Sequence, residues 1–390
     1  MRIAVVLPEL DATAGGGFSF QSALHDALRE LEAEIEHELV YLVPDTDGRG
    51  PPYVRMRMDA RAHIARAAIG LLRDVQDRAL GTVRRLDRAT DFERLLEDHG
   101  IDLVWFSTPW ATDCDRPYLF THWDMGYREQ PWFGELSGAG EFARRDRLLA
   151  RYVPAASRVI TPNPSGTAEL LRRIPLGPER ILELPHPTPP FALAAARRDP
   201  VDRAVAERVG GRGLYLLYPA QFWQHKNHPT LMRAIAELDG YGAVLVGSDK
   251  GARERVEALA AELGISDRVS FPGFVEEEEL VALYQHAHAL AYPSFLGPEN
   301  LPPLEAMALG CPVVVADVAG AEHQLRDAAL RFAAPDHTAL AEAVRSLEDD
   351  ELRERLVGAG RALAAERTAR SYVEGVLVAV DELAAIGVGA

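Results

Sequence analysis

The sequence predicts two successive α/β domains, each built on a parallel β-sheet covered by helices. Short β-branched runs alternate with longer stretches of helical periodicity, which is typical of βαβ units. This alternation stops in a proline-rich segment that begins near residue 184 and starts again near residue 214. In addition, 390 residues exceed what a single hydrophobic core usually serves.

The first half contains the strand-like runs of one domain. The expected strands are Ile3–Leu7, Glu38–Leu42, Ile101–Phe106, Tyr118–Thr121 and Arg158–Thr161. Between the second and third of these, Arg55–Arg94 has helical spacing and holds ten arginines against six acids, so we expect a basic helical insertion. Two interpretations stay open for it: a surface that docks on anionic lipid or a lipid-phosphate acceptor, or a solvated helix with internal ion pairs.

The second half repeats the pattern. Its expected strands are Leu214–Tyr218, Gly242–Val246, Val269–Pro272, Ala289–Pro293 and Pro312–Ala316, with helices such as His228–Leu238 and Lys250–Leu263 between them. Closely spaced prolines stiffen the junction between the two sets. The predicted organisation is a first domain over residues 1–186, a linker over 187–212, a second domain over 213–370, and a terminal helix over 371–390 that crosses back to the first domain.

Composition excludes several classes of protein. Acidic residues outnumber basic ones 59 to 42, for a net charge of −17, which argues against a nucleic-acid binder. Cys114 and Cys311 lie far apart without CxxC spacing, so neither a disulfide framework nor a zinc site is indicated. The apolar run at the N-terminus is too short for a signal peptide, and no run reaches membrane-spanning length. These features predict a cytoplasmic protein, peripheral at the inner face of a membrane if the basic insertion binds lipid.

The segment that carries most chemical information is residues 293–314, which read PSFLGPENLPPLEAMALGCPVV. A strand ends at Pro293, an irregular loop follows, and a helix begins near Pro302 or Pro303, where proline suits the first turn. The loop thus delivers backbone N–H groups and a positive helix end to one place, which suits a diphosphate. Glu305 in the first turn could accept hydrogen bonds from ribose hydroxyls or simply provide a favourable charge at the helix start.

Three further segments follow predicted strands. Lys226 lies in the loop YPAQFWQHKNH after the first strand of the second domain, where a lysine either binds phosphate or is ordinary surface. Gly15–Gly17 follows the first strand of the chain, and glycines there allow close backbone approach to a ligand. His122 ends another strand, where functional groups gather in open α/β sheets, although a packed core histidine is the other interpretation.

Residues 276–279 are four consecutive glutamates, which by themselves would suggest a metal site. They are better explained as acids in the first turn of a helix, where the helix dipole favours them.

The 293–314 segment resembles the signature S-x-x-E-G-F-G-L-P-x-L-E-A-M-A-x-G-x-P-V-V of the retaining GT-B glycosyltransferases of family 4. The match is close from Leu301 to Val314, and the order of elements agrees over nearly the whole chain. The resemblance implies a GT-B fold, in which two Rossmann-like domains with parallel sheets face each other across a cleft. It also implies transfer of a hexose-type sugar from a nucleoside diphosphate sugar to an acceptor hydroxyl, with retention of configuration and without a metal or another cofactor.

The resemblance assigns roles residue by residue. Glu305 would bind the donor ribose, and the backbone amides of Asn300 and Leu301 would face its phosphates and sugar. Lys226 would neutralise the β-phosphate, with Gln221 at the position of the usual arginine and His225 beside it. The remaining donor contacts would come from the turn Gly273, Phe274 and Val275 against the base, and from Gly15, Gly16 and Gly17 against the phosphates.

On the acceptor side, the same resemblance places His122 against the donor sugar or acceptor hydroxyl, with Asp124 as its partner and Trp123 able to stack on sugar. The catalytic group would be His122, Lys226 and Glu299. Two alternatives of the same architecture remain open, a nucleotide-sugar epimerase and a non-catalytic sugar-nucleotide-binding protein.

One departure from the signature concerns the sugar end of the donor site. The first glutamate of the Glu-x7-Glu pair is replaced by Gly297, and Glu299 follows two residues later. Either Glu299 takes the sugar-contacting role by a different loop path, or it faces solvent and the contact is lost.

Overall fold

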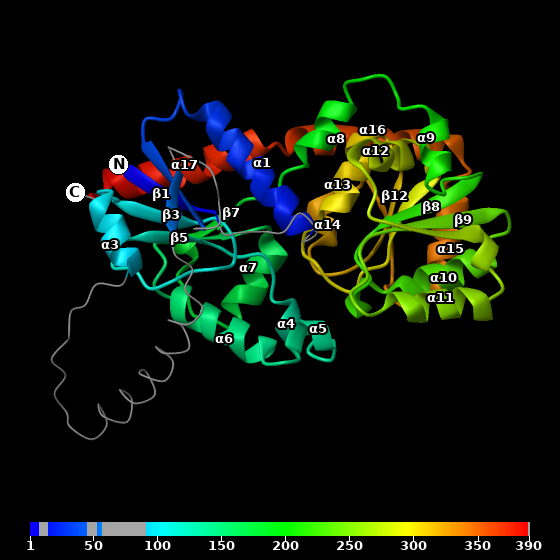
Figure 1. The fold of residues 1–390 in the computed structure, drawn as a ribbon, viewed down its shortest axis with the longest axis horizontal. Coiled ribbons are helices and arrows are strands. Elements are labelled where there is room, and N and C mark those ends of the chain that lie inside the picture. Colours follow the sequence, from blue (N-terminus) through cyan, green and yellow to red (C-terminus); the bar gives the residue numbers. More distant parts are fainter. Residues whose placement is uncertain (8–14, 45–52, 57–90, 389–390) are drawn as a thin grey trace.

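The computed structural model describes residues 1–7, 15–44, 53–56 and 91–388 of the chain. Two α/β domains lie side by side, each with a parallel sheet flanked by helices (Figure 1). The predicted fold class is confirmed. Within the described residues, no helix is long and apolar enough to cross a bilayer.

The first domain holds a parallel sheet of seven strands in the order β3-β2-β1-β4-β5-β6-β7. Its strands are β1 (Arg2–Val6), β2 (Glu38–Pro44), β3 (Tyr53–Met56), β4 (Leu103–Phe106), β5 (Tyr118–Thr121), β6 (Arg158–Thr161) and β7 (Ile181–Glu183). The interior strand β1 pairs with both β2 and β4, so that Ile3 lies between Leu39 and Leu103. The helices of this domain are α1 (Gly16–Leu31), α3 (Asp91–Asp98), α4 (Gly126–Glu129), α5 (Gly134–Ser137), α6 (Glu141–Tyr152) and α7 (Pro164–Leu171).

The second domain holds a parallel sheet of six strands in the order β10-β9-β8-β11-β12-β13. These are β8 (Leu214–Pro219), β9 (Tyr241–Val246), β10 (Val269–Gly273), β11 (Ala289–Tyr292), β12 (Val313–Ala316) and β13 (Leu330–Phe332). Its helices include α8 (Pro190–Ala195), α9 (Arg203–Arg208), the 3-10 turn η3 (Gln224–Lys226), α10 (His228–Glu237), α11 (Arg253–Glu262), α12 (Glu277–His286), α13 (Leu301–Ala308), α14 (Ala321–Leu325), α15 (His337–Ser346) and α16 (Asp350–Glu366). The strand order reverses between β8 and β11, and in such sheets ligands bind beyond the carboxyl ends of the strands at that point.

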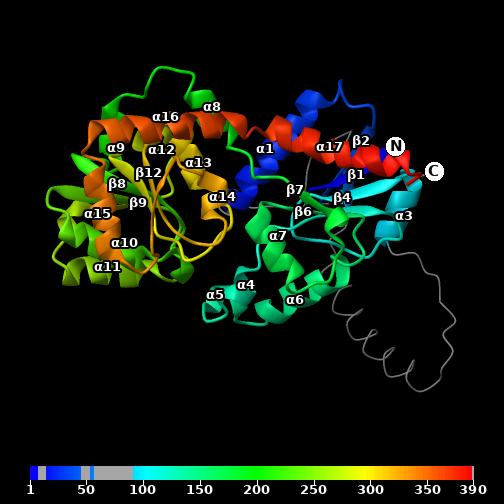
Figure 2. The same cartoon turned by 180° about the vertical axis from the view of Figure 1, so that it is seen from behind.

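Helix α17 (Ala369–Ala385) follows α16 but packs against α1 of the first domain. Figure 2 shows α16 and α17 running one after the other along the same side of both domains. Tyr372, Val373 and Val376 of α17 are buried in the same hydrophobic cluster as Ile3 and Val5 of β1. The chain therefore crosses between the domains twice, near residue 187 and near residue 367.

Three of the edge strands differ from the sequence expectations. The sequence did not predict β3, β7 or β13, each of which is three or four residues long. The expectation of a helix from Arg55 onward is wrong for Arg55 and Met56, because both belong to β3 and pair in register with β2. Arg94 lies in helix α3 as expected. The rest of the basic insertion, residues 57–90, lies outside the described residues.

Candidate functional site

The candidate site lies at the carboxyl ends of β8 and β11, where η3 and the loop 293–300 meet. Proline at the start of α13 fixes the helical φ without removing a needed hydrogen bond, which explains why the helix begins directly at Leu301. Pro302 and Pro303 have no N–H, so the donor left at the start of α13 is the Leu301 N–H, which lies beside the loop at the positive end of the helix dipole.

Lys226 ends η3 and is one of only two lysines in the chain. Its Nζ donates to the Tyr292 hydroxyl at 3.1 Å and lies 5.3 Å from the centre of that ring. The Tyr292 hydroxyl in turn donates to Oδ1 of Asn300 at 3.2 Å. This chain of two hydrogen bonds holds the ammonium group beside the start of α13.

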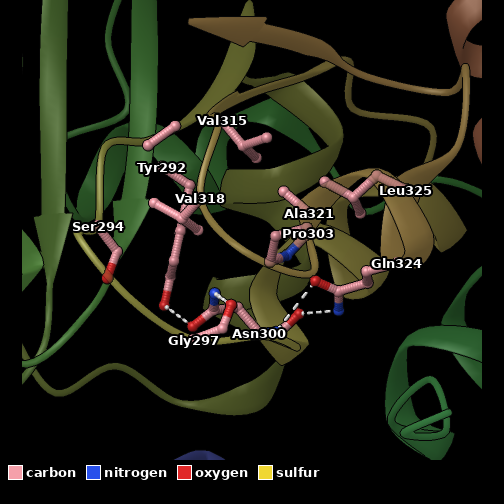
Figure 3. A pocket seen from close by; sticks show the side chains of 11 residues that line it. Tyr292, Ser294, Gly297, Asn300, Pro303, Val315, Val318, Ala321, Gln324 and Leu325 are labelled. Atoms are coloured by element: carbon pink, nitrogen blue, oxygen red, sulfur yellow. Dashed lines mark hydrogen bonds between the residues drawn. The ribbon is translucent and has the colours of Figure 1, made fainter. Parts of the chain in front are cut away.

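Asn300 is the N-cap residue of α13 and is held from two sides. Its backbone N–H donates to Gln324 Oε1 at 3.1 Å, and its carbonyl accepts from Gln324 Nε2 at 2.6 Å. Figure 3 shows these bonds in a pocket to which Tyr292 and Gly297 also contribute. The Asn300 N–H assigned to the donor phosphates therefore already has a protein acceptor, whereas that of Leu301 opens the helix.

Gly297 has a backbone conformation that disfavours the glutamate of the signature. Its φ of +120° is one that residues with a side chain rarely adopt, and a Cβ there would lie 2.6 Å from the amide atoms of Asn300. The departure from the family pattern is thus built into the path of the loop, and the Asn300 amide fills the adjacent space.

Glu305 lies one turn into α13 and is 7% exposed. The Tyr284 hydroxyl donates to its Oε2 at 2.6 Å. Burial raises the pKa of Glu305 to about 7, against the hydrogen bond from Tyr284, which lowers it. A carboxylate that is buried away from water in this way is strongly stabilised by new hydrogen-bond donors, and two ribose hydroxyls would be such donors.

Glu299 differs from one of the two sequence interpretations, the one in which it faces solvent. Its side chain is fully buried, so the expectation that it faces solvent is wrong. One carboxylate oxygen lies 3.0 Å from Nη1 of Arg367, and the other accepts the backbone N–H of His186 at 2.6 Å. Both oxygens are thus engaged by the segments that cross between the domains. Burial raises the pKa of Glu299 to about 7, against Arg367 and the His186 N–H, which lower it.

His122 directly follows β5 in the first domain and is 1% exposed. Neither ring nitrogen has a hydrogen-bond partner within the described part of the chain. Burial lowers the pKa of His122 to about 4, although the nearby Asp124 opposes the shift, so the ring is neutral at pH 7. A buried polar ring without partners is what a ligand hydroxyl would satisfy.

Trp123 and Asp124, which follow His122 in the sequence, make different kinds of contact. Asp124 Oδ1 accepts the Gly126 N–H at 2.8 Å, so one of its oxygens shapes the start of α4. The Trp123 ring lies 5.7 Å from that of Phe20, edge to face, while its Nε1 has no partner among the described residues. Trp123 is therefore partly a packing residue with one unused donor.

The glycines of the first domain open α1, where Gly15 has a φ of +73°. A Cβ on Gly15 would lie 3.9 Å from the Gln221 side chain, and one on Gly16 would lie 3.6 Å from Leu301. The glycine turn that continues to Gly17 therefore meets the second domain beside the start of α13.

His225 makes a further contact between the domains. Its backbone N–H and its Nδ1 lie 2.9 and 3.0 Å from the same oxygen of Glu135, in α5. Burial and the adjacent Lys226 lower the pKa of His225 to about 4, against Glu135, so the neutral ring donates through Nδ1. Gln221 accepts from Trp223 Nε1 at 2.9 Å and lies in the same loop.

The turn after β10 is more open. Gly273 has a φ of +80°, and its carbonyl accepts the Gly247 N–H at 2.9 Å. Phe274 is 70% exposed, while Val275 is buried in the core of the second domain. Glu276 caps α12 reciprocally with Glu279, which agrees with their interpretation as residues of a helix start.

Sequence reasoning missed four residues that organise the site. Tyr284, Tyr292 and Gln324 hold Glu305, Lys226 and Asn300, and Glu135 holds His225. No local pattern marks them, since each reaches the site from a separate segment.

The two parallel-sheet domains, with the candidate residues at their facing ends, define a GT-B architecture. Residues 206–363 match the family model described as glycosyl transferases group 1. Among solved structures, the chain is similar to sucrose-phosphate synthase from Thermosynechococcus elongatus, with a TM-score of 0.75, 20% identity and coverage of 99% of this chain and 100% of that one. Anabaena Alr3699/HepE in complex with UDP-glucose has a TM-score of 0.71 at 16% identity, covering 98% and 100%.

Two curated relatives are similar in sequence. The O-antigen chain mannosyltransferase RfbU of Salmonella typhimurium is 30% identical over 135 residues, 34% of this chain and 38% of the relative. The D-inositol 3-phosphate glycosyltransferase of Acidothermus cellulolyticus is 32% identical over 245 residues, 58% of this chain and 54% of the relative. The matches thus span about half, or less, of the length of these relatives.

Proposed function

We propose that the protein is a glycosyltransferase that moves a hexose-type sugar from a nucleoside diphosphate sugar to an acceptor hydroxyl, with retention and without a metal. The observation that carries the proposal is the convergence of Lys226, the start of α13 and Glu305 at the carboxyl ends of β8 and β11. A cation, the positive helix start with the Leu301 N–H, and a carboxylate for ribose are the kinds of group that bind a nucleoside diphosphate. The relatives and the matched family model support the same class of reaction.

In the proposed reaction, the bond between the sugar C1 and the diphosphate oxygen breaks, and a bond from C1 to the acceptor oxygen forms. The acceptor proton passes to the departing diphosphate on the same face, which accounts for retention. Lys226, the Leu301 N–H and the positive end of the α13 dipole stabilise the charge that develops on the leaving group. His122, neutral and without a protein partner, hydrogen-bonds a hydroxyl of the donor sugar or the acceptor.

The sugar nucleotide is identified first by binding. Thermal-shift measurements with UDP-, GDP- and dTDP-sugars should single out one nucleotide, because a ligand that binds only the folded state raises the melting temperature by mass action. UDP-glucose is the first to test, since Alr3699/HepE was solved with it.

The reaction is then followed with that donor and a panel of hydroxyl acceptors, and the anomeric configuration of the product is read by NMR. An α-linked product from an α-linked donor supports the proposal. Epimerisation without any acceptor would identify an epimerase instead. Tight binding with neither transfer nor hydrolysis would indicate a binding protein.

A further inference from the structure

The ion pair between Glu299 and Arg367 is the most deeply buried one that the described residues show. The two side chains are 0% and 6% exposed, and their charged atoms lie 3.0 Å apart. Removing two charges from water is costly, so a buried pair is a poor device for stability alone. The segments that this ion pair joins are therefore more informative than its contribution to stability.

Glu299 joins segments that are distant in the sequence. Its second oxygen accepts the His186 N–H at 2.6 Å. His186 and Arg367 belong to the two segments that cross between the domains. These segments are also bonded to each other through Thr188. Its N–H donates to the Arg367 carbonyl at 2.8 Å, and its hydroxyl donates to the Ala364 carbonyl at 2.9 Å. A single carboxylate is thus bonded to both crossings.

The loop beside Glu299 is fixed on its other sides as well. The Asn163 side chain, which caps α7 of the first domain, donates to the Pro298 carbonyl at 2.8 Å. Gln324 of α14 brackets the backbone of Asn300, and Arg367 Nη2 reaches the His323 carbonyl in the same helix at 3.1 Å. The loop that leads into α13 is therefore attached to the first domain, to α14 and to both crossings.

We propose that Glu299 is a positioning residue that fixes the loop 294–301 to the two interdomain crossings, so that the relative orientation of the domains and the placement of the α13 start are coupled. The carboxylate acts through the protein and does not touch the donor sugar. This inference rests on the proposed function only in taking the α13 start as the phosphate-binding end of the donor site.

Binding measurements distinguish this role from a sugar contact. Glu299→Gln keeps an acceptor for the His186 N–H but removes the charge opposite Arg367. If Glu299 contacted the sugar, the variant would lose affinity only for the sugar nucleotide. If the loop is displaced instead, the affinities for the nucleoside diphosphate and for the sugar nucleotide fall by the same factor. We expect a common loss of roughly tenfold for UDP and UDP-glucose, or for GDP and GDP-mannose if the wild type prefers guanine, a size usual for coupled sites.

Two further variants complete the design. Arg367→Lys keeps the positive charge but loses the forked geometry, so it should show a smaller loss of the same kind and serves if Glu299→Gln fails to fold. Glu366→Gln is the matched control, because Glu366 precedes Arg367 in the sequence and its ion pair with Arg326 is exposed. Its binding should equal that of the wild type.

Loss confined to the sugar nucleotide would overturn the inference, and so would unchanged binding in a folded Glu299→Gln variant. Hydrogen exchange provides a readout that needs no ligand. The amides of His186 and Asn300 should exchange faster in Glu299→Gln than in Glu366→Gln, and equal protection would contradict the coupling. If the wild type binds none of the nucleotides, the proposed function fails, while the exchange result still decides the role of Glu299.

Discussion

Glu305 and Glu299 are two buried carboxyl groups six positions apart, and they differ in what surrounds them. Glu305 has one neutral donor, the Tyr284 hydroxyl, and burial raises its pKa to about 7. Glu299 has a guanidinium and a backbone N–H, both from the interdomain crossings. The comparison shows that Glu305, at the proposed nucleotide end, is incompletely partnered among the described residues, whereas both oxygens of Glu299 are bonded to the segments that cross between the domains.

The largest expected effect concerns the nucleotide end. Lys226→Ala removes the cation beside the α13 start, and we expect turnover to fall by roughly 10²- to 10³-fold, the usual cost of losing one group that stabilises a developing anion. Steady-state kinetics with the identified donor measures it. Lys250→Ala is the matched control, because Lys250 is the other lysine of the chain and its side chain is exposed. Equal activity of the two variants would remove Lys226 from the mechanism.

The second prediction tests the incomplete pairing of Glu305 through pH. Its folded-state pKa of about 7 exceeds the ordinary value of 4.5, so the folded protein binds the proton more tightly than the unfolded chain does. Stability from this group is therefore fully present below about pH 4.5 and is lost as pH rises to about 7. The whole change has an upper limit of about 3 kcal/mol at 1.36 kcal/mol per pKa unit.

Glu305→Gln lacks this titration and should become more stable than the wild type as pH rises, as measured by denaturant unfolding across that range. The exposed Glu354→Gln variant should follow the wild-type curve. If the free energies of unfolding of the wild type and Glu305→Gln differed by the same amount at all pH values, this would contradict the burial of Glu305 without a charged partner.

The smallest expected effect concerns the backbone at the sugar end. Gly297→Ala adds a Cβ at a φ of +120°, 2.6 Å from the Asn300 amide, so we expect the free energy of unfolding to fall by at least about 1 kcal/mol. Gly358→Ala in α16 is the control, because nothing lies within 4 Å of its added Cβ. That helical substitution should be stabilising by roughly 0.5–1 kcal/mol.

If Gly297→Ala were as stable as the wild type, the loop would have room for a side chain. The glutamate of the signature could then be restored by Gly297→Glu. On the backbone seen here, Gly297→Glu should instead be less stable and should not gain activity.

Much of the architecture was predictable because hydrophobic periodicity is a local property. The runs that became β1, β4, β5, β6 and β8 are nearly continuous apolar segments, as buried parallel strands require, and the start of α13 is marked by its own prolines. The three short edge strands β3, β7 and β13 carry weaker patterns, because each has at most one buried residue and pairing with a neighbour decides its conformation.

The candidate site also contains residues that the sequence predicted and residues that it did not predict. His122 directly follows β5, and Lys226 and Glu305 lie in the connections that follow β8 and β11, so the sequence alone could place all three at the carboxyl edges of the predicted sheets. Their partners Tyr284, Tyr292, Gln324 and Glu135 were not found, since long-range hydrogen bonds leave no trace in local spacing.

The sequence by itself determined two parallel α/β domains, the loop after β8 that carries Lys226, and the start of the helix that carries Glu305. Only the tertiary structure decided which groups partner the Glu299 carboxylate. The residue lies where a sugar-contacting carboxylate was sought, yet its partners come from His186 and Arg367, 113 and 68 positions away. A buried charge must find its counter-charge wherever the fold brings one, and that choice is made by three-dimensional proximity, not by order along the chain.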